Sequence, residues 1–187
     1  MMAHNIPDAE YLRKLLTYEP DTGLLFWRQR TPDMFPPGKQ SSELICARWN
    51  SKNAGKEAFV TIRKGYKNGA INGTNFSAHR VIWTMQTGAL PSGVIDHVNG
   101  IRTDNRMENL RDVTLSENLK NRCIGRRNKS GCLGVFFNGS RWVCQIGHSG
   151  RAHHVGQFAT FEEAVEARRQ AEIEHGFHEN HGRLSND

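Results

Sequence analysis

Residues 94–118 constrain the fold of this 187-residue chain more than any other stretch. A short β-branched run there ends in an acid and a histidine, Asp96 and His97, and the Asn-Gly pair at residues 99–100 is a typical turn former. Neighbouring side chains of a strand point to opposite faces, so this acid and histidine can serve one site only where the strand ends or bends. The turn supplies that end.

A second strand and a helix are expected downstream of the turn. Residues 111–114 are typical of a short strand, and Thr114 or Ser116 can cap a helix that carries Asn118 in its first turns. Asn121 follows three residues later, which places it on the same helical face. The stretch therefore predicts a strand, a loop, a strand and a helix in close succession.

These side chains suit the hydrolysis of a phosphodiester bond. That reaction needs an activated water and stabilisation of the charge that develops on the phosphate and the leaving oxygen. His97 is the group most easily poised near neutral pH as a general base. Asp96 and Asn118 offer oxygen ligands, which hard cations such as Mg²⁺ prefer.

The pattern resembles the HNH endonuclease motif of phage-borne, homing-like enzymes, in which two short strands and a helix hold one divalent metal ion. The resemblance implies a ββα-metal core in which His97 is the general base. It further implies that Asp96 and Asn118 are metal ligands and that Asn109 holds the His97 loop by hydrogen bonding. Asn118 stands where the family often has histidine, which favours Mg²⁺ or Mn²⁺ over zinc.

The middle position of the motif has several candidates. Asn99, Asn105 and Asn109 compete for it, and the spacing and the place just before the second strand favour Asn109. The alternative for the whole segment is a turn region rich in asparagine and aspartate.

A second pattern spans residues 130–182. Short alternating runs separated by Gly-Ser and Ser-Gly turns precede an alanine-rich helix that begins at a capping box, Thr160 with Glu163. The pattern resembles the APETALA-two/ethylene-response-factor DNA-binding domain, which implies a three-stranded antiparallel sheet packed on one helix and laid in the DNA major groove. The first strand lacks the arginines of the plant domains, so base specificity does not carry over. The alternative is a small α+β module with scattered surface cations.

The charge distribution favours a polyanionic partner. The net charge is +6, and residues 79–130 carry 9 cations against 5 anions. A basic linker is expected at residues 124–130, where it can follow a phosphate backbone. The residues predicted to contact DNA are Arg80, Asn121, Arg122, Arg126, Arg127, Lys129, Arg141, Gln145, Arg151 and His154.

The N-terminal part is expected to complete the nuclease unit, residues 1–123, as an α/β part at 1–78 before the ββα-metal core at 79–123. A helix from Asp8 to about Leu16, a long loop over residues 31–57 and a helix from Ala78 to Gly88 are predicted there. His79 either braces the site or contacts DNA, or it is a structural histidine at a helix start. Residues 131–187 form the expected recognition domain.

We therefore predict an α+β, metal-dependent DNA endonuclease with one Mg²⁺ or Mn²⁺ ion, double-stranded DNA as its partner and no small-molecule cofactor. The sequence contains no run of eighteen apolar residues and so predicts no membrane span, and a cytoplasmic protein is expected. The four cysteines form no C-x-x-C pair, and reduced thiols are expected. The alternatives are a non-catalytic DNA-binding regulator on a degenerate HNH scaffold and an RNA-acting protein. Removal of residues 130–187 is expected to weaken target binding more than it harms the core chemistry.

Overall fold

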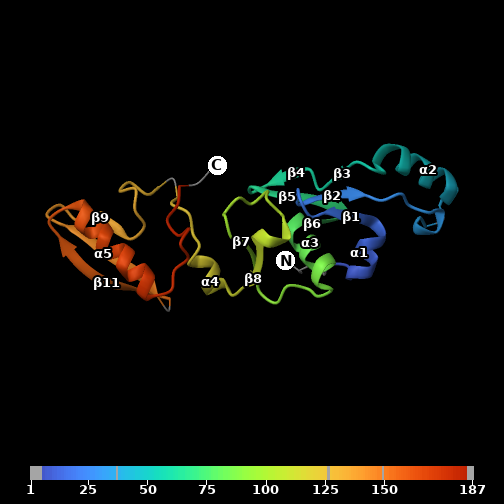
Figure 1. Ribbon diagram of the computed structural model, residues 1–187. Coiled ribbons are helices and arrows are strands. Elements are labelled where there is room, and N and C mark those ends of the chain that lie inside the picture. Colours follow the sequence, from blue (N-terminus) through green and yellow to red (C-terminus); the bar gives the residue numbers. More distant parts are fainter. Residues whose placement is uncertain (1–5, 37, 126, 149, 185–187) are drawn as a thin grey trace. The chain divides into compact units, whose positions relative to one another are not determined.

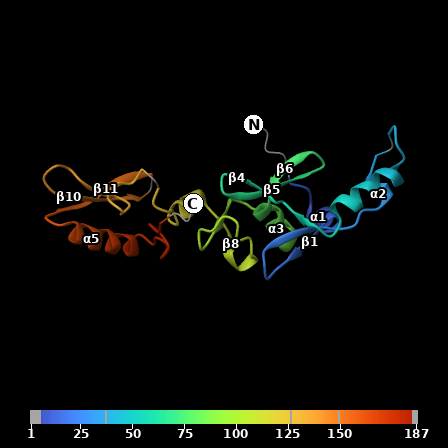
Figure 2. The ribbon, with the colours of Figure 1, turned by 90° about the horizontal axis from the view of Figure 1, so that it is seen from above.

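The computed structural model of the chain describes residues 6–36, 38–125, 127–148 and 150–184, and Figures 1 and 2 show its ribbon. The chain forms two compact units. The first consists of Met1–His97 and Ile101–Asp112, and the second of Val98–Gly100 and Val113–Asp187. The loop that follows His97 thus belongs to the same unit as the C-terminal part of the chain. Both units mix helices with small sheets, which confirms the α+β class.

The β-structure of the first unit consists of short strands, namely β1 (Leu16–Glu19), β2 (Leu24–Trp27), β3 (Glu57–Ala58), β4 (Thr61–Arg63), β5 (Tyr66–Ile71), β6 (Thr74–Ser77), β7 (Val94–His97) and β8 (Leu110–Val113). They form an antiparallel sheet in the order β1-β2-β3, a second in the order β4-β5-β6, and the pair β7-β8. The two strands expected around the Asp-His pair are therefore present and paired with each other.

The helices of this unit are α1 (Ala9–Leu15), α2 (Ser42–Asn53) and α3 (Ala78–Thr87), with short 3-10 turns η1 (Pro32–Met34) and η2 (Met107–Asn109). Two of the predicted helices are confirmed with their caps. Asp8 accepts a hydrogen bond from the Tyr11 amide at the start of α1, and Gly88 ends α3 in the left-handed conformation, φ 78°.

Helix α3 anchors the motif strands to the core. It packs against α1, β5 and β6, and its Val81 and Ile82 are fully buried. Ile95 on β7 and Leu110 on β8 belong to the same apolar cluster, at 8% and 6% exposure. Burial of this cluster fixes the strand end on which Asp96 and His97 lie.

The prediction of a long loop over residues 31–57 is wrong, because the helix α2, Ser42–Asn53, lies within it. Ser41 caps this helix by accepting a hydrogen bond from the Leu44 amide. Asn50 exchanges two hydrogen bonds of 2.9 Å with the Arg30 backbone, and the Arg30 guanidinium lies 3.9 Å from the Trp49 ring centroid. Only one residue of α2 is buried, so the sequence has no apolar stripe by which to recognise the helix.

The β1–β2 hairpin supports the loop between β7 and β8. The Tyr18 hydroxyl accepts a hydrogen bond from the Met107 amide at 2.9 Å and donates to the Asn105 carbonyl at 3.1 Å. Gly23, in the hairpin turn at φ +71°, approaches so closely that a Cβ atom there would lie 2.5 Å from the Arg106 nitrogen. Only glycine fits this contact.

The second unit holds α4 (Leu115–Leu119), β9 (Val135–Phe137), β10 (Trp142–His148), β11 (Arg151–Phe158) and α5 (Phe161–Glu174). The strands form an antiparallel sheet in the order β11-β10-β9, and α5 lies along one face of it (Figure 2). The capping box of Thr160 and Glu163 is confirmed at the start of α5. Ala164 is fully buried against Val135 and Cys144, so the small residue allows close packing of helix and sheet.

Helix α4 is shorter than the sequence suggests. Thr114, and not Ser116, is its cap, and it forms a capping box with Glu117. The helix ends at Leu119, so Asn121 lies beyond it and the expected helical face shared with Asn118 does not extend that far. The structure also groups α4 with the C-terminal sheet, whereas the sequence placed it with the nuclease; the domain bounds remain a prediction. None of the described helices has the length and apolar character needed to cross a bilayer.

Replacing Gly23 by alanine should destabilise the first unit more than the same change at Gly73. Both glycines have a left-handed φ, which costs an L-residue about 1–2 kcal/mol, but nothing lies within 4 Å of a Cβ at Gly73. The clash at Gly23 should add about 1–3 kcal/mol. Urea unfolding followed by circular dichroism measures both variants, and equal losses would contradict the close contact.

Candidate active site

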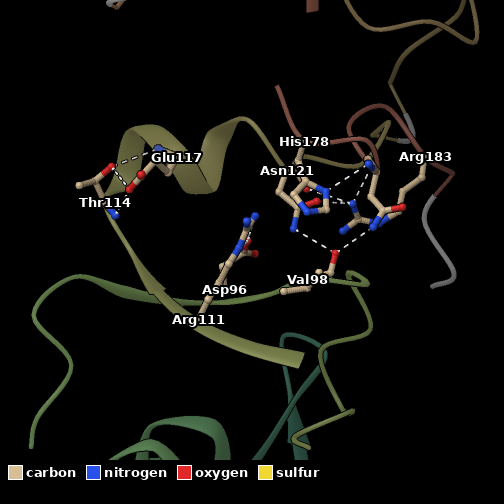
Figure 3. A network of polar contacts seen from close by, with 9 residues as sticks. Asp96, Val98, Arg111, Thr114, Glu117, Asn121, His178 and Arg183 are labelled. Atoms are coloured by element: carbon tan, nitrogen blue, oxygen red, sulfur yellow. Dashed lines mark hydrogen bonds and ion pairs between the residues drawn. The ribbon is translucent and has the colours of Figure 1, made fainter. Parts of the chain in front are cut away.

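Asp96 and His97 end β7 and are almost fully buried, at 8% and 3% exposure. Their side chains have different partners. The Asp96 carboxylate pairs with Arg111 on β8, as Figure 3 shows, whereas His97 contacts Asn105 in the loop between β7 and β8. This division follows from the alternation of side chains along a strand.

The His97 imidazole is oriented by one buried hydrogen bond. Its Nε2 atom lies 3.1 Å from Oδ1 of Asn105, a residue with 0% exposure. An amide oxygen only accepts, so this contact favours the tautomer in which Nε2 carries the proton. In that tautomer Nδ1 is the basic nitrogen of the ring.

The asparagine that touches the histidine is Asn105, whereas Asn109, which the sequence favoured for the middle position of the motif, has a partner within the loop. The Asn109 amide donates to the Asp104 carbonyl at 2.8 Å, so this bond braces the residue next to Asn105. The Asp104 carboxylate in turn receives two hydrogen bonds from the Arg106 guanidinium, at 2.9 and 2.7 Å. Several side chains thus fix the loop that presents Asn105.

Two aromatic rings pack beside His97 on the side of α3 and β5. The His79 ring lies 5.3 Å from that of His97, and the Tyr66 ring lies 5.0 Å from His79 and 5.8 Å from His97. The Arg102 guanidinium lies 5.1 Å from the Tyr66 centroid and donates to the Lys64 carbonyl. His79 is 8% exposed and its ring packs on His97, which fits both the bracing and the structural alternative.

Burial keeps both histidines neutral at physiological pH. Desolvation is the largest cause that lowers the pKa of His97, although Asn105 and the carboxylates of Asp96 and Asp104 oppose it. Desolvation, with smaller contributions from His97 and Arg80, lowers the pKa of His79 to about 3. An unprotonated imidazole is the form that a general base requires.

The carboxylate of Asp96 is a hard oxygen donor of the kind that Mg²⁺ or Mn²⁺ takes. Arg111 donates from Nε at 2.9 Å and from Nη2 at 2.7 Å, both to Oδ2. The chemistry of the donor fits the expected ion, and the ion pair holds the carboxylate in one orientation.

No three His, Cys, Asp or Glu side chains gather as a metal site within the described part of the chain. The site expected from the sequence is of another kind, with one carboxylate and one amide. The expected amide ligand, Asn118, is on α4 in the second unit. The four cysteines form no disulfide.

Asn121 has an internal role that differs from the expected contact with DNA. It is 4% exposed; its Oδ1 accepts from Arg183 at 2.7 Å and its Nδ2 donates to the Val98 carbonyl at 3.4 Å (Figure 3). Both polar ends of the amide are thus engaged inside the protein. The prediction of a DNA contact at this position is corrected on that ground.

The other residues expected to contact DNA lie largely at the surface. Arg80 on α3 is half-buried, and Gln145 on β10 is half-buried with its carbonyl bound by Arg168. Arg126 lies outside the described residues. The exposed members of the set are Arg122, Arg127, Lys129, Arg141, Arg151 and His154.

Sequence reasoning missed several residues of the site. Tyr66, Arg102 and Arg111 contact the Asp-His pair or its neighbours from other strands and loops. The sequence did carry a signal for Arg111, because this residue lies at the start of the strand that pairs with β7. Tyr66 had none, because its contact depends on how β5 packs beside α3.

Comparison with known proteins agrees with this geometry over one segment. Residues 76–120 match the family model described as HNH endonuclease, a range that begins in β6 and ends just after α4. The match supports an HNH nuclease and, with it, DNA as the substrate. No curated protein and no solved structure matches the chain.

The stability of the protein should fall as the pH drops below 6.5, in part because of His79. The unfolded chain binds a proton on this imidazole near pH 6.5, whereas the folded chain binds it only near pH 3. The stabilisation that comes from the neutral His79 is therefore fully present above pH 6.5, and it decreases as the pH falls toward 3. Between pH 7.5 and 5 the loss from His79 should be about 2 kcal/mol.

Urea unfolding at both pH values measures this loss. A His79→Gln variant should show the smaller pH dependence, and His154→Gln, which changes an exposed imidazole, should behave as the wild type. Identical pH dependence in the wild type and His79→Gln would rule out a buried, neutral His79.

Proposed function

We propose that this protein is a metal-dependent DNA endonuclease of the HNH type, homing-like in organisation, with a separate sequence-recognition module. The observation that carries the proposal is the buried His97 imidazole, which follows Asp96 at the end of β7 and is held by Asn105. The match of residues 76–120 to HNH endonucleases supports it.

In the proposed reaction His97 acts as the general base. The imidazole takes a proton from a water molecule, the water oxygen forms a bond to phosphorus, and the bond from phosphorus to the 3′ oxygen breaks. The leaving 3′ oxygen takes a proton from solvent water, and His97 returns its proton to solvent. By resemblance to the family, the products are 5′-phosphate and 3′-hydroxyl ends. Asn105 keeps the Nε2–H of the ring engaged during proton transfer, so that the ring does not rotate.

Asp96 and Asn118 are the proposed ligands of one Mg²⁺ or Mn²⁺ ion. When bound, such an ion supplies positive charge that stabilises the phosphate and the leaving oxygen. Arg111 orients the Asp96 carboxylate through its two hydrogen bonds. The same ion pair also favours a second candidate, a non-catalytic DNA-binding regulator, because it occupies lone pairs of the carboxylate.

Residues 131–187 are the proposed recognition module. Its sheet carries exposed Arg151 and His154 on β11, with Arg141 at the start of β10, whereas α5 begins with Glu162 and Glu163. Gln145 and His154 are cross-strand partners and so lie on the same face of the sheet. A sheet of this kind can enter the major groove with its cationic side toward the phosphates.

The His97→Ala variant should cleave DNA about 10²–10⁴ times more slowly than the wild type at saturating DNA. Its affinity for DNA should be nearly unchanged, because the imidazole is buried and acts on the water. The Asn105→Leu variant should also be slower, since the ring loses its acceptor. Single-turnover cleavage of plasmid DNA with Mg²⁺, Mn²⁺ or Zn²⁺ and with chelator measures these rates.

Asn75→Ala, at an exposed position of β6, is the matched control for the asparagine change. If the wild type binds DNA but shows no metal-dependent cleavage, the second candidate, a non-catalytic DNA-binding regulator, is correct. If His97→Ala cleaves at the full rate, the general base is another group.

Arg141→Gln with Arg151→Gln should weaken DNA binding and reduce its salt dependence. Each lost phosphate contact lowers the log–log salt slope by about 0.9. Titrations at several salt concentrations give this slope, and the same titrations against RNA compare the two substrates. Arg169→Gln, which removes an exposed charge on α5, should leave the slope unchanged; an equal effect there would indicate non-specific charge attraction.

A further inference from the structure

The C-terminal strap, Phe177–Leu184, runs along the segment that follows α4. The His178 amide donates to the Lys120 carbonyl at 3.1 Å, and the Gly182 amide to the Arg122 carbonyl at 2.8 Å. The Ile124 amide donates back to the Arg183 carbonyl at 2.8 Å, and Ile124 and Leu184 form a parallel bridge. The strap is therefore held to residues 120–124 by backbone bonds along its length.

Two side chains of the strap reach the loop that follows His97. Asn180 donates to the Val98 carbonyl at 3.2 Å, and the same carbonyl receives the Asn121 amide (Figure 3). Arg183 donates to the Asn121 side-chain oxygen at 2.7 Å and to the Asn121 carbonyl at 3.2 Å. One carbonyl next to the general base is thus fixed by two amides, and one of these is fixed by an arginine.

Gly100 shows how closely the strap packs on this loop. A Cβ atom at Gly100 would lie 1.7 Å from Nη2 of Arg183, and its φ of +74° also requires glycine. The guanidinium therefore lies directly on the loop backbone. With Asn121 only 4% exposed, these polar contacts are shielded from water, which makes them costly to break.

We propose that the strap is a positioning element of the nuclease. Through Asn180 and Arg183 it fixes the loop that directly follows His97 and the segment that follows Asn118, and so limits the movement of the backbone at both places. The proposal rests on the proposed function. It also changes the expectation for residues 130–187, because loss of the strap should harm the chemical step as well as target binding.

The test uses the full-length variants Asn180→Ala and Arg183→Ala, with Arg183→Lys as the conservative change and Glu179→Ala, an exposed neighbour, as the control. Both alanine variants should cleave about ten to a hundred times more slowly at saturating DNA, with the dissociation constant for DNA unchanged. Arg183→Lys should recover part of the rate, and Glu179→Ala should match the wild type.

Hydrogen–deuterium exchange gives a readout that does not depend on cleavage. In the alanine variants, peptides covering Val98–Gly100 and residues 120–124 should lose protection, while those of β10 and α5 keep it. Full cleavage rates in both variants, a loss confined to DNA affinity, or unchanged exchange at Val98–Gly100 would each overturn the strap's role. If the wild type cleaves nothing, the proposed function fails, and the exchange data alone decide about the strap.

Discussion

The hydrogen bond between His97 and Asn105 is the constraint on which the candidate site depends. It joins the end of β7 to the loop between β7 and β8, and both residues are buried. The N-terminal hairpin helps to hold this loop through the Tyr18 hydroxyl and the close approach of Gly23, and the Asn109 amide braces it from within. A hairpin far away in sequence therefore helps to fix the position of His97.

The burial that orients the histidine also fixes its charge state. His79 and Tyr66 cover His97 with rings and exclude water, so protonation is unfavourable for both imidazoles. Burial gives the imidazoles a defined orientation and a neutral ring, and the fold loses stability in acid as a result. The neutral state of the rings and the acid sensitivity of the fold thus have one physical cause.

The elements with local signals could be predicted from the sequence, and those held by distant contacts could not. The Asp8 cap, the Gly88 helix end and the capping box at Thr160 each depend on residues within one turn, and the structure has all three. Helix α2 is held mainly through Arg30 and Asn50, and it leaves no apolar periodicity to detect. Asn105 and Asn109 have the same side chain and are close in sequence, so only the path of the loop decides which one meets His97.

The strap extends this argument to the other end of the chain. A division into a nuclease unit and a recognition unit treats the C-terminal residues as dispensable for the chemical step. Asn180, however, binds the Val98 carbonyl beside His97, and Arg183 binds Asn121, which donates to the same carbonyl. A carbonyl held by two amides has little freedom, and a displacement of about 1 Å at a reacting group costs about 10²-fold in rate. A chain that has lost its C-terminal end should therefore be a poor nuclease even on DNA that it still binds.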